Sequence, residues 1–141
     1  MCGIFGVIAH PGALERQQLE RAITRLFMLS ETRGKESAGL AATGPRTISF
    51  QKSAQRPRDF IASPSFRSFL QEVTGTAYDA GEPFAMFGHS RLVTNGAQNL
   101  HANNQPVLAG GLLGVHNGII VNDESLWRGM NAAERKAEVD T

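Results

Sequence analysis

Cys2 is the residue of this sequence whose type and position most clearly suggest covalent chemistry. It is the only cysteine among 141 residues and it follows Met1 directly. Because cysteine is small, removal of Met1 by an aminopeptidase is expected to leave Cys2 as the first residue, with a free α-amino group beside its thiol. An α-amine has a reference pKa of about 7.7–8.0, so it can take up a thiol proton near neutral pH. Such a pair is a known arrangement for a nucleophile, although a cysteine at position 2 can also be accidental.

Two further places could complete an acyl-transfer site, which needs an oxyanion hole and a group that orients the substrate. Asn117 and Gly118 offer a side-chain amide and an adjacent backbone N–H that can point at one oxygen. Arg91, at the expected end of a strand, can bind a substrate carboxylate through two parallel hydrogen bonds. Each also has an ordinary structural interpretation: an Asn-Gly hairpin turn in the first case and a surface salt bridge in the second.

The composition is that of one globular domain and excludes several classes of function. Hydrophobic residues make up 41% and charged residues 19% of the chain, with a formal net charge of +1. Neither a nucleic acid nor a membrane is therefore an expected partner. One cysteine cannot form an internal disulfide, and the histidines are too scattered for a structural zinc site. No basic leader precedes the short apolar run at 4–9, so we expect a protein of the reducing cytoplasm.

The elements that must position these residues are short strands and amphipathic helices. Apolar and β-branched runs predict strands at 2–9 (buried on both faces), 40–43, 47–52, 84–90, 107–115 (interrupted by glycines) and 119–121. Helices are predicted over 13–30, over a short segment that begins at Pro64 behind an N-cap at Ser63, and around Leu126 behind Asn122. Polar or connecting segments are predicted at 53–59, 75–83 and 91–106, with a tight turn at 116–118. Strands joined by turns indicate antiparallel sheets with helices packed outside.

Four motifs occur in order along the chain: Cys2-Gly3-Ile4-Phe5-Gly6, Arg33-Gly34-x-x-Ser37-Ala38-Gly39, Gly88-His89-x-Arg91-x-x-Thr94-x-Gly96 and His116-Asn117-Gly118-Ile119-Ile120. Together they resemble the glutaminase domain of class II glutamine amidotransferases, which are N-terminal nucleophile hydrolases. The motifs are most similar to those of the glucosamine-6-phosphate synthase and amidophosphoribosyltransferase types. The resemblance covers essentially the whole chain. It implies an α+β fold with four layers (αββα), in which two antiparallel sheets lie between helices.

The resemblance also implies a reaction: hydrolysis of the glutamine side-chain amide to glutamate and ammonia through a thioester on the cysteine. The implied catalytic residues are Cys2, with its α-amine as base, and Asn117 and Gly118 as the oxyanion hole. The implied substrate-binding residues are Arg91 for the α-carboxylate, Thr94, Asn95 and Gly96 in the loop that follows, and Asp140 for the α-amino group. Arg33, Gly34 and Ser37 are implied to be scaffold. This chemistry needs no metal and no organic cofactor.

Three features depart from the family pattern. Leu92 stands where relatives that make amino sugars usually have an aromatic residue, and Asn95 replaces a common histidine. The run Asn103-Asn104-Gln105-Pro106 is closer to the amidophosphoribosyltransferase branch. The chain also ends just after Asp140-Thr141, where relatives continue. The single domain, residues 1–141, is therefore expected to be incomplete at its C-terminus, with unpaired sheet edges that favour association into homo-oligomers.

The expected partners follow from the reaction. The chain has no glycine-rich phosphate loop, so the ammonia is expected to pass to an acceptor synthase domain, on a missing part or on a separate subunit. Two alternatives remain open at this stage. An amidase acting on another amide would keep Cys2 and the oxyanion hole, but would have little use for Arg91 and Asp140 as a clamp. A non-catalytic remnant would bind glutamine, or nothing, without turnover.

Overall fold

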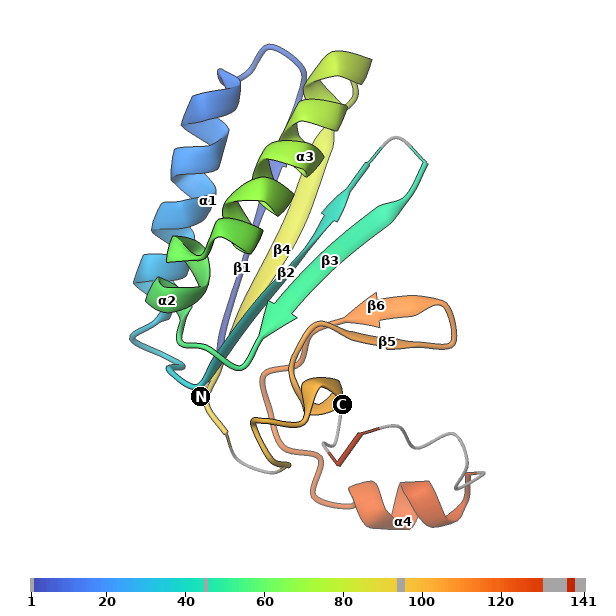
Figure 1. Ribbon diagram of the computed structural model, residues 1–141. Coiled ribbons are helices and arrows are strands. Elements are labelled where there is room, and N and C mark those ends of the chain that lie inside the picture. Colours follow the sequence, from blue (N-terminus) through green and yellow to red (C-terminus); the bar gives the residue numbers. More distant parts are fainter. Residues whose placement is uncertain (1, 45, 94–95, 131–136, 139–141) are drawn as a thin grey trace.

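The computed structural model describes residues 2–44, 46–93, 96–130 and 137–138. It has a four-stranded sheet with three helices on one face and a smaller part beyond one end of the sheet (Figure 1). The strands are β1 (Gly3–Ala9), β2 (Ser37–Thr43), β3 (Ile48–Ser53), β4 (Phe84–Arg91), β5 (Val107–Ala109) and β6 (Leu112–Gly114). The helices are α1 (Arg16–Ser30), α2 (Pro57–Ala62), α3 (Pro64–Ala80), the 3₁₀ turn η1 (His101–Asn103) and α4 (Asp123–Arg128).

The strand order of the main sheet brings the start of β1, directly after Cys2, and Arg91 of β4 to one end of the sheet. The order is β1-β4-β2-β3 and every neighbouring pair is antiparallel. β4 therefore lies between β1 and β2, with Ser90 opposite Gly3 and Arg91 opposite Ser37. The beginnings of β1 and β2 consequently meet the end of β4.

The core lies between the sheet and the helices, and Phe27 of α1 is at its centre. The ring of Phe27 packs edge-on against three other rings. The distance between ring centroids is 4.7 Å to Phe5 and 5.6 Å to both Phe60 and Phe66. Edge-to-face packing suits aromatic rings and adds to the free energy gained by burying them. Leu19, Ile23 and Phe27 are fully buried, which confirms the amphipathic pattern predicted for this helix. α1 begins later than expected, at Arg16.

The segment between β3 and β4 is more helical than the sequence predicted. Ser63 Oγ accepts from Phe66 N at 3.2 Å, which confirms the N-cap of α3. The loop predicted at 75–83 is wrong, because α3 continues to Ala80 and ends at Gly81 in the left-handed conformation. Gly75 is buried inside the helix, where a Cβ would lie 3.1 Å from Arg16 Nη1 on α1. Gly75, predicted to begin a connecting segment, thus lies within the helix and leaves room for the Arg16 guanidinium of α1.

α2 was also missed by the sequence analysis, which predicted a polar segment at 53–59. Pro57 stands at the N-terminus of this helix and Phe60 is buried in the core. Glu31, at the end of α1, accepts from Arg58 N at 2.8 Å and from Arg58 Nε at 2.6 Å. Burial of Glu31 acts to raise its pKa, but the hydrogen bonds and charge of Arg58 outweigh this and leave the pKa lowered. This contact ties the two helices together.

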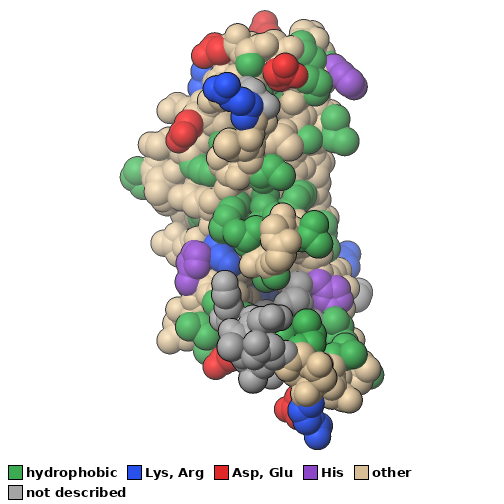
Figure 2. Space-filling model, turned by 90° about the vertical axis from the view of Figure 1, so that its right-hand side faces the viewer, with side chains coloured by type: hydrophobic (Ala, Val, Ile, Leu, Met, Phe, Trp, Pro, Cys, Tyr) green, Lys and Arg blue, Asp and Glu red, His purple; other side chains and the backbone are tan. Residues whose placement is uncertain are grey.

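On the face of the main sheet away from the helices, parts of the edge strands β1 and β3 are exposed, whereas β2 is buried on both faces. Ile4 and Ile8 of β1 are 47% and 77% exposed, so the prediction that this strand is buried on both faces is wrong. Ile48 and Phe50 of β3 are exposed as well. Figure 2, which shows the side of the molecule that lies to the right in Figure 1, has hydrophobic patches between groups of charged side chains. The described residues show an α+β fold with antiparallel sheets, and a four-layer sandwich remains a prediction.

The C-terminal part differs from the predicted strands in two places. Residues 107–115 form a hairpin, β5–β6, that turns at Gly110 and Gly111, both with positive φ. The tight turn at 116–118 and the strand at 119–121 are not formed, and this segment is irregular with a bend at Gly118. α4 lies where the sequence placed it, behind Asn122. Among the described helices, none has the length and apolar character needed to cross a membrane.

Candidate active site

Cys2 lies directly before β1, and its half-buried side chain contacts the chain just after β4. The Cys2 sulfur accepts from Leu92 N at 3.3 Å and its thiol donates to Leu92 O at 3.6 Å. These contacts orient the sulfur. They exist because β1 and β4 pair in the register that sets Gly3 opposite Ser90. The sequence alone held no signal for this contact, since the two residues are 90 positions apart.

Gly34 allows the chain before β2 to pass against the end of β4. A Cβ at this position would lie 2.3 Å from Ser90 O and 2.5 Å from the carbonyl carbon of Arg91. Backbone atoms cannot yield to such an overlap, so only glycine fits. Arg33 Nε donates to Cys2 O at 3.4 Å, and Ser37 is buried. The scaffold function that the resemblance implies for these residues agrees with the contacts they make.

Arg91 is buried and its guanidinium bonds to the loop that follows β4. Only 3% of the residue is exposed, so the interpretation as a surface salt bridge is wrong. Its Nη1 donates to Asn104 Oδ1 and its Nη2 to Gly96 O, both at 3.0 Å. Gly96 has a positive φ of 71°. Arg91 thus cross-links β4 to the loop, and its expected contact with a substrate carboxylate stays a prediction.

A set of buried amide side chains holds this loop in place. None of them was predicted from the sequence to have a function. Asn103, Asn104 and Gln105 are each no more than 6% exposed. Asn104 Nδ2 donates to Gln98 O at 2.8 Å, and Gln98 Nε2 donates to Glu36 O and Ala54 O. Buried amides must find partners, because an unpaired one costs roughly 1–3 kcal/mol. A run of three amides before a proline is the signal that could have predicted a structured loop.

Asn103 connects the same loop to the last described residues. Asn103 Oδ1 accepts from Glu138 N at 2.8 Å, and Asn103 Nδ2 donates to Glu138 Oε2 at 2.9 Å. Ala97 N also donates to Glu138 Oε2, at 3.0 Å. Three further candidate residues, Thr94, Asn95 and Asp140, lie outside the described residues.

His89 is a fully buried titratable group on β4, in a motif that the sequence analysis used only for resemblance. In the described part of the chain neither ring nitrogen has a hydrogen-bond partner. Burial lowers the pKa of His89 to about 4, and the charges of Arg91 and His116 act in the same direction. The backbone of His116 lies close enough to offset part of this effect, although not in hydrogen-bonding geometry. His89 is therefore neutral at pH 7.

The expected oxyanion residues follow a backbone segment that Gln105 holds. Gln105 Oε1 accepts from His116 N at 2.6 Å, and Gln105 Nε2 donates to His116 O at 3.2 Å. Asn117 and Gly118 are exposed. Because His89 lies near both Arg91 and His116, the segment that leads to Asn117 reaches the same end of the sheet as Cys2. No hydrogen bond joins Cys2 to Asn117 or Gly118 within the described ranges.

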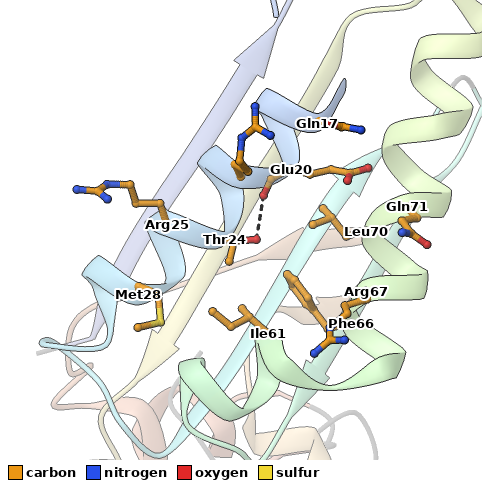
Figure 3. Close-up of a pocket in the computed structure, with 11 residues that line it drawn as sticks. Gln17, Glu20, Thr24, Arg25, Met28, Ile61, Phe66, Arg67, Leu70 and Gln71 are labelled. Atoms are coloured by element: carbon orange, nitrogen blue, oxygen red, sulfur yellow. Dashed lines mark hydrogen bonds between the residues drawn. The ribbon is translucent and has the colours of Figure 1, made fainter. Parts of the chain in front are cut away.

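A groove of about 950 Å³ lies elsewhere, between α1 and α3. Figure 3 shows its lining residues, which come from α1, α2 and α3 and include none of the expected site residues. Phe66 and Leu70 belong to its apolar floor and are buried, whereas Arg25 points away from α3. The groove is a feature of the outer helical face. We assign the candidate active site to the sheet end instead.

An α+β fold with antiparallel sheets and a cysteine before its first strand is compatible with an N-terminal nucleophile hydrolase. The chain is 34% identical over 145 residues to the glutamine–fructose-6-phosphate aminotransferase (isomerizing) of Rhizobium meliloti, covering 100% of this chain and 20% of that enzyme. It is 30% identical over 127 residues to the enzyme of the same name from Corynebacterium efficiens, covering 89% and 19%. It is 28% identical over 132 residues to the amidophosphoribosyltransferase of Methanocaldococcus jannaschii, covering 91% and 24%.

The chain thus spans about a fifth to a quarter of the length of these curated relatives. No family model matches it. The similarities support a relationship to the class II glutamine amidotransferases, and both types named from the motifs are among the relatives found.

Proposed function

We propose that residues 1–141 act as a glutaminase domain, which hydrolyses the side-chain amide of glutamine with Cys2 as the nucleophile. One observation carries the proposal: the Cys2 sulfur lies 3.3 Å from Leu92 N, directly after Arg91 at the end of β4. A candidate nucleophile and a candidate carboxylate ligand thus meet at one end of the sheet. The similarity to glutamine-using amidotransferases supports the choice of glutamine.

The proposed reaction proceeds in two acyl-transfer steps. After removal of Met1, the α-amine of Cys2 accepts the thiol proton and the sulfur attacks the carboxamide carbon. Asn117 Nδ2 and Gly118 N donate to the oxygen, which becomes negatively charged. The ammonium form of the α-amine then gives its proton to the amide nitrogen, and the C–N bond breaks to release ammonia. Water attacks the resulting thioester in the same way, which releases glutamate and restores the thiol.

The two ends of the substrate are recognised by different chemistry. Arg91 binds the α-carboxylate, which must join or replace the present partners Asn104 and Gly96. The loop at 94–96 and Asp140 complete the binding of the amino-acid end. The ammonia passes to an acceptor domain or subunit. No cofactor takes part in these steps.

One observation favours a second candidate function. The guanidinium of Arg91 already bonds to Asn104 and Gly96, so a substrate without an α-carboxylate would leave these contacts intact. An N-terminal nucleophile amidase acting on another amide fits that arrangement. Comparing turnover of glutamine with that of simple primary amides separates the two functions, because only the glutaminase requires the amino-acid end.

The experiment that tests the proposal is the intact mass of the purified protein before and after reaction with 6-diazo-5-oxo-L-norleucine, a glutamine analogue. We expect a mass without Met1 and a single adduct on Cys2, together with release of ammonia from glutamine. A processed protein that forms no adduct and releases no ammonia would contradict the proposal and favour a non-catalytic remnant. If Met1 is retained, the protein with Cys2 as its first residue is prepared by proteolytic removal of an N-terminal tag and tested in the same way.

A further inference from the structure

The side chain of Gln105 pairs with the backbone of His116 through both of its amide atoms. Its Oε1 accepts from His116 N at 2.6 Å, and its Nε2 donates to His116 O at 3.2 Å. The amide thus makes the two hydrogen bonds that a neighbouring strand would make. Only 6% of Gln105 is exposed and His116 is half-buried, so the pair is partly shielded from water. Hydrogen bonds are stronger in such surroundings than in water. This contact fixes the backbone one residue before Asn117.

Gln105 is itself held by two strands of the main sheet. Its carbonyl oxygen packs so closely on β2 that a Cβ at Gly39 would lie 2.2 Å away. On β3, Lys52 Nζ donates to the carbonyls on either side of Gln105, to Asn104 O at 2.6 Å and to Pro106 O at 2.9 Å. Burial lowers the pKa of Lys52, and these two carbonyls are its hydrogen-bond partners. The segment 104–106 is therefore a rigid base for the Gln105 side chain.

We infer that Gln105 is a positioning residue that holds the Asn117–Gly118 backbone in place for the chemistry at Cys2, an inference that rests on the function proposed above. Asn117 and Gly118 are exposed and make no hydrogen bond of their own within the described residues. Their position therefore depends on the backbone that precedes them. Oxyanion donors stabilise a transition state only when they are already in place, to within about half an ångström. Gln105 holds these donors in place through the backbone of His116 and does not itself contact the substrate.

The test compares Gln105→Met with Gln98→Met. Methionine has a volume close to that of glutamine but cannot form either hydrogen bond to His116. Gln98 is a matched control, because its amide also supports the loop, through Glu36 O and Ala54 O, but does not contact His116. Three quantities are measured on the full chain: hydrogen exchange of the His116 amide by NMR, kcat and KM for glutamine, and the rate of Cys2 alkylation by iodoacetamide.

In Gln105→Met we expect exchange of the His116 amide to rise about five- to tenfold, as for loss of an ordinary hydrogen bond. We expect kcat to fall about tenfold or more while KM stays near the wild-type value, since the oxyanion donors act in the transition state. Alkylation of Cys2 should be unchanged, because direct displacement of iodide needs no oxyanion hole. Gln98→Met should leave exchange at His116 as it is in the wild type.

Two outcomes overturn the inference. Unchanged exchange at His116 in Gln105→Met would show that Gln105 does not hold this backbone. Faster exchange with an unchanged kcat would show that it holds the backbone without any effect on the reaction. If the wild-type chain itself neither reacts with 6-diazo-5-oxo-L-norleucine nor releases ammonia, the proposed function fails and the catalytic half of the inference fails with it. In that case, hydrogen exchange of the His116 amide still tests whether Gln105 holds this backbone.

Discussion

Arg91 and Asn104 are joined by a buried hydrogen bond of 3.0 Å between a guanidinium and an amide oxygen, which ties the end of β4 to the loop that follows it. The bond places a charged group within the fold on β4, the strand that pairs with β1, and Cys2 directly precedes β1. It also gives one residue two functions, because the proposed ligand of the substrate carboxylate is at the same time part of the protein's own packing.

Replacing Arg91 by alanine should therefore affect both binding and stability. We expect a higher KM for glutamine, from loss of the carboxylate ligand, and a loss of stability of roughly 2–4 kcal/mol from loss of its buried hydrogen bonds. Asn104→Ala is the matched control, since it removes the same cross-link and leaves the guanidinium in place. Steady-state kinetics and denaturant unfolding measure the two effects. If both variants lose stability but neither changes KM, Arg91 is structural only.

Cys2→Ala should abolish release of ammonia and formation of the adduct with 6-diazo-5-oxo-L-norleucine. The side chain is only half-buried, and its hydrogen bonds are weak ones to the backbone of Leu92. We therefore expect the melting temperature to change little. Ammonia assays and circular dichroism check the two halves of this prediction. Activity that survives the substitution would remove Cys2 from the mechanism.

Asn117→Ala should lower kcat by about 10²–10³, the usual effect of losing one oxyanion donor. Asn117 is exposed and makes no hydrogen bond among the described residues, so the fold should be unaffected. Asp123→Asn, on the helix that follows, serves as a control for a polar change outside the proposed site. The measurement is kcat under saturating glutamine. A kcat equal to that of the wild type would exclude this side chain from the oxyanion hole.

Gly34→Ala should be strongly destabilising or should displace the end of β4, because its Cβ would lie 2.3 Å from Ser90 O. Since the Cys2 sulfur contacts the residue just after β4, glutaminase activity should fall with stability. Gly114→Ala, in β6, is the control, because its Cβ would meet no atom within 4 Å. Thermal unfolding of the two variants tests the comparison. Equal melting temperatures would contradict the close packing seen here.

His89 makes stability depend on pH in a defined window. Its pKa is lowered from 6.5 to about 4 in the folded state, so protonation favours the unfolded chain. The contribution of the neutral ring is therefore complete above pH 6.5 and is lost as the pH falls towards 4, by up to roughly 3 kcal/mol in total. His89→Gln, which cannot titrate, should show a flatter profile of unfolding free energy between these values. Parallel profiles for the two proteins would contradict the prediction.

Local pattern predicted much of the fold. The period of apolar residues located α1, runs of small or apolar residues located β2 and β4, and alternation located β3. The errors have physical causes that are not local. Gly75 is buried within α3 beside the Arg16 side chain of α1, and Ile4 and Ile8 are exposed because they lie on the edge strand β1, on the face away from the helices.

Candidate residues for the site can be chosen from the sequence by type, but their contacts cannot. Cys2, Arg91 and Asn117 can be chosen for their chemistry from the sequence. Burial of Arg91, the contact of Cys2 with Leu92 and the pairing of Gln105 with His116 all depend on strand register and loop packing. These long-range relationships leave no periodic signal in the chain.

The strand order also determines when this site can form during folding. β2 and β3 can pair as a hairpin early, but β1 has no partner in the main sheet until β4 arrives, since β4 lies between β1 and β2. Contacts between segments so far apart in sequence carry a large loop-closure entropy and form slowly. As the chain leaves the ribosome, its first strand must wait until residue 91 has emerged. Cys2 can therefore contact Leu92 only after β4 has joined the sheet. Until then, its thiol lacks the hydrogen bonds to the backbone of Leu92.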